Sequence, residues 1–204
     1  MTRWAGPLGE HLHGAALERG LIGAEERLTP ELAFRLVRDM PYARADTHEP
    51  AGIIGGWRGT CSTKHELLQA LLLEWGLQSR LIACTQLIRL PPGADMDPEL
   101  KALAAGEPVV DVHNYLVVHT PHGDMTVDAT WPLEAAAFGL PTNPEWVWGQ
   151  DMQIGCTPLQ SWDVPPEQTL TAFKDRLLAE QYTPAQLERR ERFIRRVGEL
   201  FLNP

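Results

Sequence analysis

The chain has 204 residues, of which 44% are hydrophobic and 22% charged, and its formal net charge at pH 7 is −9. This length can bury one substantial core, and the negative charge argues against general binding to nucleic acid or to anionic membranes. No apolar run reaches the roughly 18 residues that a membrane-spanning helix needs. The first residues carry no apolar stretch of the signal-peptide type, so we expect a cytoplasmic protein.

Two helices are predicted in the first part of the chain. The first runs from Thr29 to about Met40, because Thr29 is a good N-cap and is followed by proline and glutamate in the first turn. Residues 41–56 are expected to form a loop. The second helix starts at Cys61 and ends near Gly76. Its apolar side chains recur at helical spacing, at Leu67, Leu68, Leu71, Leu72 and Trp75.

Three strands are predicted in the middle of the chain. The segment 79–90 is short and apolar, which predicts a buried strand. The segments 109–120 and 125–131 are rich in β-branched and aromatic side chains, which predicts a strand in each. The tetrapeptide PHGD between the last two is typical of a turn. These two strands are therefore expected to form a hairpin.

Two irregular segments flank the predicted hairpin. The acidic stretch 91–108 is expected to hold a short helix capped by Asp97 and ended by Gly106. Residues 132–166 are rich in Pro and Gly and are predicted to form loops that shape a cleft. We expect the tryptophans of these loops to be packing residues, of which one could line the cleft: Trp146, Trp148 and Trp162.

The last predicted element is a long amphipathic helix opened by a Thr183 and Gln186 capping box. Its apolar stripe could pack within the chain or support a homodimer, and it comprises Leu187, Ile194, Val197 and Phe201. Residues 167–204 hold seven Lys or Arg against six Asp or Glu, which favours a salt-bridged helix face over a nucleic-acid-binding arm. We predict an α+β fold with one domain over 1–166 and a helical C-terminal extension over 167–204.

Three segments supply a thiol, an imidazole and a carboxylate, in the order Cys61, His113 and Asp128. Thiol acyl transfer needs these groups, because a thiolate attacks the carbonyl, an imidazole moves the proton and a carboxylate orients the imidazole. Cys61 follows a Gly-rich turn at the start of a helix, where the macrodipole favours thiolate and free backbone N–H groups can bind an oxyanion.

The hairpin register predicts a separation between the imidazole and the carboxylate. A two-residue turn at His122 and Gly123 would set Asp128 opposite Val117, on the same face as His113 but four residues along the strand. That offset is roughly 13 Å. A strong twist, a bulge or a wider loop would have to close it.

The segments GTCSTKHELL, DVHNYLVV and VDATW resemble the transglutaminase-like members of the papain-type cysteine hydrolase superfamily, over residues 57–131. The resemblance implies a helix packed on a curved antiparallel sheet that brings the histidine and the aspartate together. It makes Cys61 the nucleophile, His113 the base and Asp128 the orienting acid. The implied chemistry is acyl transfer or amide hydrolysis through a thioester, on a peptide or a small amide or acyl substrate, without a cofactor.

Two further residues are candidates for supporting roles. Trp57 is a possible side-chain oxyanion donor by its proximity to the nucleophile alone. His65 lies one helical turn after Cys61 and could pack, bond to a loop or support catalysis.

Other readings of the same residues stay open. Cys61, His113 and Asp128 could each be structural, so that the fold serves as a non-catalytic binding or interaction module. A metal site built on the hairpin residues His113, His119, His122 and Asp124 is disfavoured, because their spacing matches no zinc motif. The other two cysteines, Cys84 and Cys156, are expected to have no chemical role.

Overall fold

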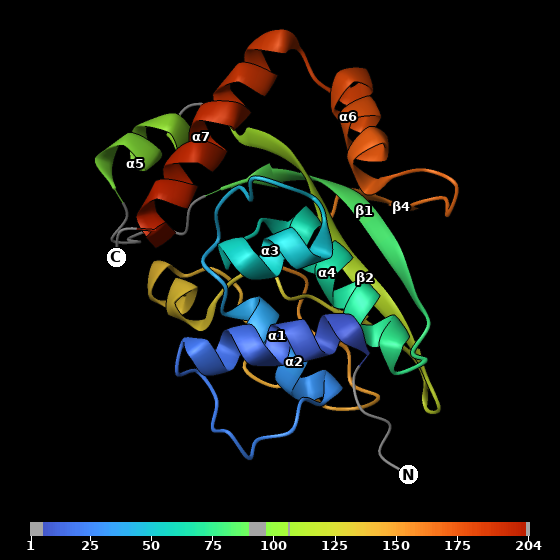
Figure 1. Cartoon of the computed structure of the whole chain (residues 1–204). Coiled ribbons are helices and arrows are strands. Elements are labelled where there is room, and N and C mark those ends of the chain that lie inside the picture. Colours follow the sequence, from blue (N-terminus) through green and yellow to red (C-terminus); the bar gives the residue numbers. More distant parts are fainter. Residues whose placement is uncertain (1–5, 90–96, 106, 203–204) are drawn as a thin grey trace.

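The computed structural model describes residues 6–89, 97–105 and 107–202 and has an α+β architecture (Figure 1). The helices are α1 (Pro7–Glu18), α2 (Pro30–Arg38), α3 (Pro50–Gly56), α4 (Cys61–Glu74), α5 (Pro98–Ala104), α6 (Leu170–Gln181) and α7 (Pro184–Leu202), with a 3-10 helix η1 (Leu133–Phe138). The strands are β1 (Ser79–Ile88), β2 (Val109–Thr120), β3 (Gly123–Val127) and β4 (Gln160–Asp163). Within the described ranges, no helix is long and apolar enough to cross a membrane.

Helices α2 and α4 begin and end where the sequence predicts. The Thr29 side chain accepts a hydrogen bond from the Leu32 N–H at 3.2 Å and so caps α2. Helix α4 starts at Cys61, and Gly76 follows its end with φ +77°, a left-handed conformation that glycine adopts without strain. Both predictions are confirmed.

The predicted caps of α5 and α7 are also present. Asp97 accepts from two backbone N–H groups of the first turn of α5, whereas the predicted end at Gly106 lies outside the described residues. At α7, the Thr183 N–H donates to Gln186 Oε1 at 2.9 Å, as a capping box requires.

Several elements were not predicted individually from the sequence, among them α1, α3 and β4. Helix α1 was not expected at all, α3 lies inside the expected loop 41–56, and β4 lies inside the expected loop 132–166. Helices α1 and α3 are rich in glycine, which disfavours helix, but each buries apolar side chains completely, including Leu12, Ile53 and Ile54. Strand β4 has four residues and exists through its pairing with β1. Tertiary contacts therefore determine all three elements.

The sheet is antiparallel throughout, in the order β3-β2-β1-β4. Strand β1 pairs along its whole length with residues 109–118 of β2, but β3 pairs with residues 116–120 alone. Residues 109–115 of β2 therefore have no β3 neighbour on their outer edge. The chain segment that follows β3 and the start of α4 approach this part of β2.

The expected hairpin turn is wrong by one residue. The two-residue turn is formed by Pro121 and His122, because Thr120 pairs with Gly123. The second strand of the hairpin accordingly spans 123–127 instead of the expected 125–131.

This correction shortens the predicted separation between the imidazole and the carboxylate. The last pair of the ladder joins Leu116 to Val127, so Asp128 would face Tyr115 if the pairing continued. The offset from His113 is then two residues, about 7 Å, and not four. Pairing ends at Val127, where the chain leaves the sheet. The Asp128 carboxylate then lies 2.7 Å from His113 Nε2.

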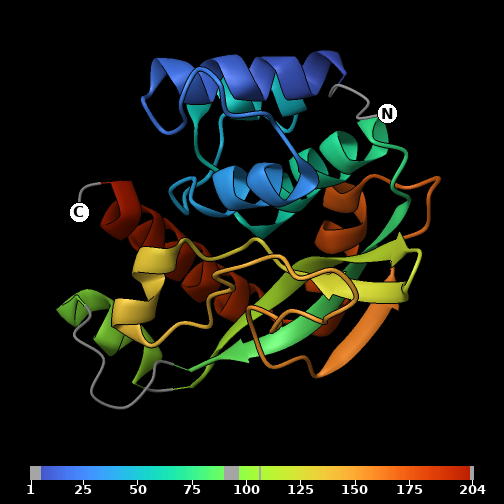
Figure 2. The same cartoon turned by 90° about the horizontal axis from the view of Figure 1, so that it is seen from below.

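Two groups of helices cover the sheet. Helices α1 to α4 form one group, in which α1 is outermost and α2 and α4 lie between it and the sheet (Figure 2). Helices α6 and α7 pack on β1 and β2 with their own buried side chains, namely Phe173, Leu177, Leu178, Phe193, Ile194, Val197 and Phe201. The apolar stripe of α7 thus packs within the chain, and a homodimer through α7 stays a prediction.

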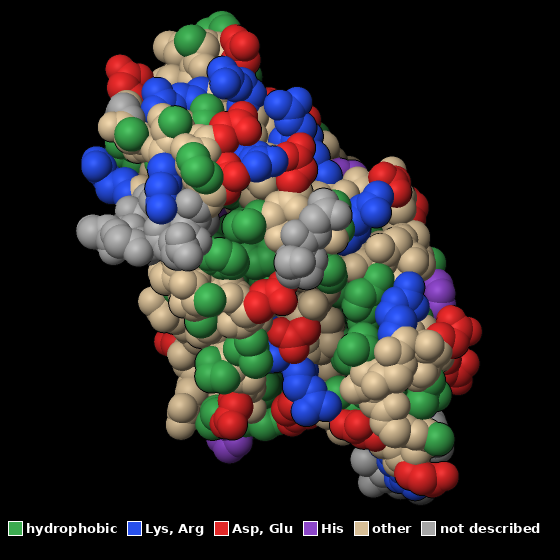
Figure 3. All heavy atoms as spheres, turned by 90° about the vertical axis from the view of Figure 1, so that its left-hand side faces the viewer, with side chains coloured by type: hydrophobic (Ala, Val, Ile, Leu, Met, Phe, Trp, Pro, Cys, Tyr) green, Lys and Arg blue, Asp and Glu red, His purple; other side chains and the backbone are tan. Residues whose placement is uncertain are grey.

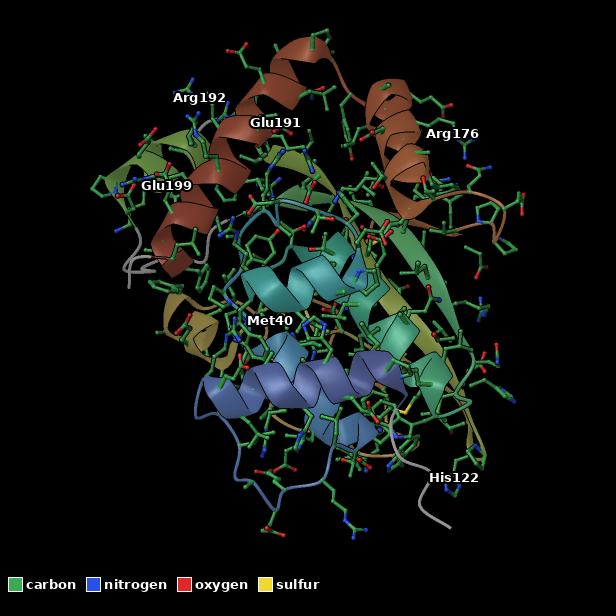
Figure 4. All side chains as sticks on the ribbon, viewed as in Figure 1. Met40, His122, Arg176, Glu191, Arg192 and Glu199 are labelled. Carbon is green, nitrogen blue, oxygen red and sulfur yellow. The ribbon has the colours of Figure 1, made fainter. Side chains whose placement is uncertain are left out.

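Charged side chains of both signs cover the outer surface of α5 and α7. Lys and Arg alternate with Asp and Glu over the upper part of this face (Figure 3). Glu191, Arg192 and Glu199 all come from α7 (Figure 4). Arg196 pairs with Asp97 at 2.6 Å and with Glu199 at 2.7 Å, and Glu191 pairs with Arg44. The prediction of a salt-bridged helix face is confirmed.

Leu72 and Leu73 provide a matched test of the packing of α4. Leu72 is fully buried, whereas its neighbour Leu73 is 56% exposed. We expect Leu72→Ala to lower the free energy of unfolding by about 2–5 kcal/mol, because it leaves a cavity in the core. Leu73→Ala should change it by less than about 0.5 kcal/mol. Urea denaturation followed by circular dichroism measures both, and equal effects would contradict the packing described.

Candidate active site

Cys61 is the first residue of α4 and is 2% exposed. The turn before it is tight: a Cβ atom on Gly59 would lie 2.7 Å from Thr63 Oγ1. The Thr60 N–H donates to Thr63 Oγ1 at 3.0 Å and fixes the start of the helix. The sulfur therefore lies at the positive end of the helix, where the first N–H groups have no acceptor within the helix.

His113 and Asp128 form a buried pair beside this helix start. His113 Nε2 lies 2.7 Å from Asp128 Oδ2. The same carboxylate accepts the Gly155 N–H at 2.7 Å and the Thr130 N–H at 2.9 Å. Burial raises the pKa of Asp128, but the charge and hydrogen bond of His113 outweigh it and hold this pKa well below its usual range. The carboxylate is thus ionised and fixed in orientation.

The thiol of Cys61 is coupled to the imidazole. The imidazole, whose Nε2 faces Asp128, lies close enough to the thiol to act on its ionisation. Burial raises the pKa of Cys61, but the charge of Lys174 and the hydrogen bond and charge of His113 lower it to about 7. Burial lowers the pKa of His113, and Asp128 and Cys61 raise it well above its ordinary value. A thiolate beside an imidazolium is therefore favoured near neutral pH.

A lysine of α6 places a second positive group beside the sulfur. Lys174 Nζ on α6 lies 3.7 Å from Cys61 Sγ and 3.4 Å from Ser62 Oγ. Asp111 holds it at 3.9 Å and also pairs with Arg190 of α7 at 2.6 Å. Sequence reasoning missed Lys174, although one signal marks it. The lysine lies within an apolar helical stripe made of Leu170, Phe173, Leu177 and Leu178.

Asn114 places a buried amide beside the sulfur. The side chain is fully buried, and its Oδ1 accepts from Ser62 Oγ at 3.0 Å and lies 3.9 Å from Cys61 Sγ. Its Nδ2 has no hydrogen-bond partner among the described residues. Such a buried donor is costly unless something binds it. Asn114 was not predicted as a site residue.

Trp57, the oxyanion donor suggested by proximity, occupies a packing position. It ends α3 in a left-handed conformation, with φ 48°. The Arg19 guanidinium lies 4.6 Å from the centre of its ring, and the ring packs against the main core. These contacts give the tryptophan a packing role at the end of α3.

His65 and Lys64 connect α4 to the segment that follows β3. His65 Nε2 accepts the Ala129 N–H at 2.9 Å, so Nδ1 carries the proton and donates to the Cys61 carbonyl at 2.7 Å. Burial lowers the pKa of His65 to about 4, which keeps the ring neutral. Lys64 Nζ donates to the Thr130 carbonyl at 3.0 Å. His65 thus links the Cys61 carbonyl to the Asp128 segment.

Two cavities meet at the site. The larger, about 790 Å³, is lined by His113, Gly155 and Cys156, together with loop residues 139–141 and 153–157. The smaller, about 260 Å³, is lined by Ser62 and Lys174. His113 therefore faces one cavity, and Ser62 and Lys174 face the other. Three side chains line both cavities: Tyr42, Asp111 and Ile194.

The remaining histidines of the hairpin lie away from the site. His119 is exposed and pairs with Asp124 at 2.9 Å, and His122 is at the tip of the β2–β3 hairpin (Figure 4). In the parts of the chain that the structure describes, no group of three or more His, Cys, Asp or Glu side chains could hold a metal ion.

Comparison with known proteins adds no family to this picture. No protein-family model matches the chain, and no curated protein matches it. The function must therefore be argued from the geometry of the site.

Lys174→Met tests the electrostatic contribution of α6. Removing a cation 3.7 Å from the sulfur should raise the pKa of Cys61 by about 1 or more. The thiolate forms as pH rises through its pKa, so alkylation of Cys61 by iodoacetamide should slow about tenfold at pH 6 and remain unchanged at pH 10. Peptide mass spectrometry measures the rate.

Two control variants accompany this measurement. Lys174→Arg keeps the charge and should retain most of the rate at pH 6, and Lys101→Met removes an exposed lysine of α5 and should have no effect. An unchanged pH profile in Lys174→Met would show that the lysine does not stabilise the thiolate.

Proposed function

We propose that this chain is a thiol enzyme with a transglutaminase-like core, which catalyses acyl transfer or amide hydrolysis through a thioester at Cys61. The proposal rests on one observation: the thiol, the imidazole and the carboxylate are buried together, with the Lys174 ammonium 3.7 Å from the sulfur. The first three groups come from α4, from β2 and from the segment after β3. A buried structural cysteine needs neither an imidazole nor a cation beside it.

In the first step, the Cys61 thiolate attacks the carbonyl carbon of an amide. A C–S bond forms, and the carbonyl π electrons move to the oxygen. His113 then gives its proton to the leaving nitrogen, the C–N bond breaks and the amine departs, which leaves a thioester. Asp128 holds the imidazole in the required tautomer and stabilises its charge.

In the second step, water or an amine attacks the thioester. His113, now neutral, takes the proton of the attacking group, and the C–S bond breaks to return the Cys61 thiolate. Water gives hydrolysis, and an amine gives acyl transfer.

The negative oxygen of each tetrahedral intermediate requires hydrogen-bond donors. The Nδ2 of Asn114, which has no partner among the described residues, is suited to this role, and so are the N–H groups of Cys61 and Ser62, which have no acceptor within the helix. Asn114 thus takes the role that the sequence suggested for Trp57.

The larger cavity is the better route for the acyl substrate, because His113 lines it. Its volume of about 790 Å³ suits a peptide segment or a small amide. Many of the side chains that line this cavity are apolar, among them Leu140, Ile154 and Leu159. The smaller cavity on the Ser62 side could admit the water or amine of the second step.

Trapping of the acyl-enzyme tests the proposed function. The protein is mixed with a panel of activated esters of short peptides and of acetate, quenched in acid, and analysed by intact and peptide mass spectrometry. Wild type should carry one acyl group on Cys61, Cys61→Ser none, and His113→Ala should acylate at least about 100-fold more slowly at pH 7. The Cys156 peptide of wild type is the internal thiol control and should carry no acyl group.

The opposite result favours the non-catalytic alternative. A folded wild-type protein that never carries an acyl group on Cys61, with any ester of the panel, would mean that the triad is structural and that the fold serves as a binding module.

Asn114→Leu separates oxyanion binding from thiol activation. Alkylation by iodoacetamide passes through no oxyanion, so its rate at Cys61 should stay within about threefold of wild type. Acylation by the best ester should fall about 100-fold to 1,000-fold, because an oxyanion donor is lost. Parallel losses in both reactions would show that Asn114 acts on the thiol or on folding instead.

A further inference from the structure

The other two cysteines lie side by side. Cys84 Sγ and Cys156 Sγ are 3.7 Å apart, although 72 residues separate them in the sequence, and both are free thiols. Cys84 is fully buried in β1, whereas Cys156 is partly exposed and lines the larger cavity. A small oxidant in this cavity can therefore reach Cys156, and Cys84 is in position to react with the product.

Cys84 and Cys156 lie next to His113 and Asp128, each through a different contact. Cys84 is the cross-strand partner of His113, so their side chains share one face of the sheet. Gly155, the residue before Cys156, donates its N–H to Asp128 Oδ2. A Cβ atom on Gly155 would lie 3.2 Å from both His113 Cε1 and Asp128 Oδ2, so this backbone is packed directly against the two side chains.

We propose that Cys84 and Cys156 are a reversible thiol–disulfide modification site, whose oxidation by a peroxide lowers the reactivity of Cys61. Formation of the disulfide does not depend on the proposed function, whereas its effect on Cys61 rests on it. The expectation that these two cysteines have no chemical role is thereby revised.

The oxidation balances with one peroxide. The sulfur of Cys156 attacks one oxygen of hydrogen peroxide, the O–O bond breaks, and Cys156 becomes a sulfenic acid with release of water. The sulfur of Cys84 then attacks the sulfenic sulfur. The S–S bond forms, and the S–O bond breaks as hydroxide, which combines with the Cys84 proton to give a second water. Two thiols lose two electrons, and the peroxide gains them.

The geometry explains how the disulfide would affect the site. A disulfide has an S–S distance of about 2.05 Å, so the two sulfur atoms must approach each other by well over 1 Å. Cys84 belongs to a strand that is paired on both sides, with His113 and with Ser161. The loop that carries Cys156 must therefore make most of the movement. Gly155 moves with it and disturbs the hydrogen bond that orients the Asp128 carboxylate.

The experiment combines peptide mapping with the reactivity of Cys61. The full chain is treated with stoichiometric hydrogen peroxide, desalted, digested without reductant and mapped. Wild type and Cys61→Ser should both give a peptide pair joined through Cys84 and Cys156, which dithiothreitol separates. Iodoacetamide alkylation of Cys61 in the oxidised wild type should be about tenfold slower at pH 6.5, and dithiothreitol should restore it.

Cys156→Ser treated with the same peroxide is the control for direct oxidation of Cys61. Its Cys61 rate should stay close to that of the untreated variant. Absence of the joined peptide would overturn the proposal, and so would a disulfide that leaves the Cys61 rate equal to that of reduced wild type. A Cys61 that is inert even in reduced wild type would instead count against the proposed function, while the mapping still reports on the thiol pair.

Discussion

The rest of the site depends on the hydrogen bonds and the opposite charge that stabilise the buried Asp128 carboxylate. An ionised carboxylate in the interior is costly unless hydrogen bonds and opposite charge surround it. Asp128 meets this requirement with His113 and with the N–H groups of Thr130 and Gly155. Because these partners belong to β2, to the segment after β3 and to the loop before β4, satisfying one carboxylate brings three distant parts of the chain together.

Cys61 is joined to Asp128 through the first turn of α4. His65 connects the Cys61 carbonyl to the Ala129 N–H, directly after Asp128. The C-terminal helices add the charge of Lys174, so the segment predicted as an extension contributes to the electrostatics of the site. Two carboxylates, Asp111 and Asp128, are buried in the same region, and the positive groups beside them lower the pKa of both.

The sequence predicts those features that local chemistry determines. Caps and helical spacing are sufficient for α2, α4 and α7, a short apolar run is sufficient for β1, and a β-branched run is sufficient for β2. The glycine-rich helices α1 and α3 and the short strand β4 have no such local signal and depend on burial. The residue types of the triad could be identified from their contexts, but the register of the hairpin could not, because a shift of one residue in the turn changes it. Asn114 and Lys174 could not be assigned, since their proximity to Cys61 arises from packing between elements remote in sequence.

Titration of the Cys61 thiolate tests the central claim most directly. The ultraviolet absorbance of thiolate is followed against pH in wild type, with Cys61→Ser subtracted, and in the Asp128→Asn variant. A thiolate–imidazolium pair predicts an absorbance step with its midpoint at about pH 7 in wild type, displaced to higher pH when the imidazolium loses its carboxylate partner. A step near pH 9 that is the same in both proteins would contradict it, and would mean that Cys61 is an ordinary buried thiol.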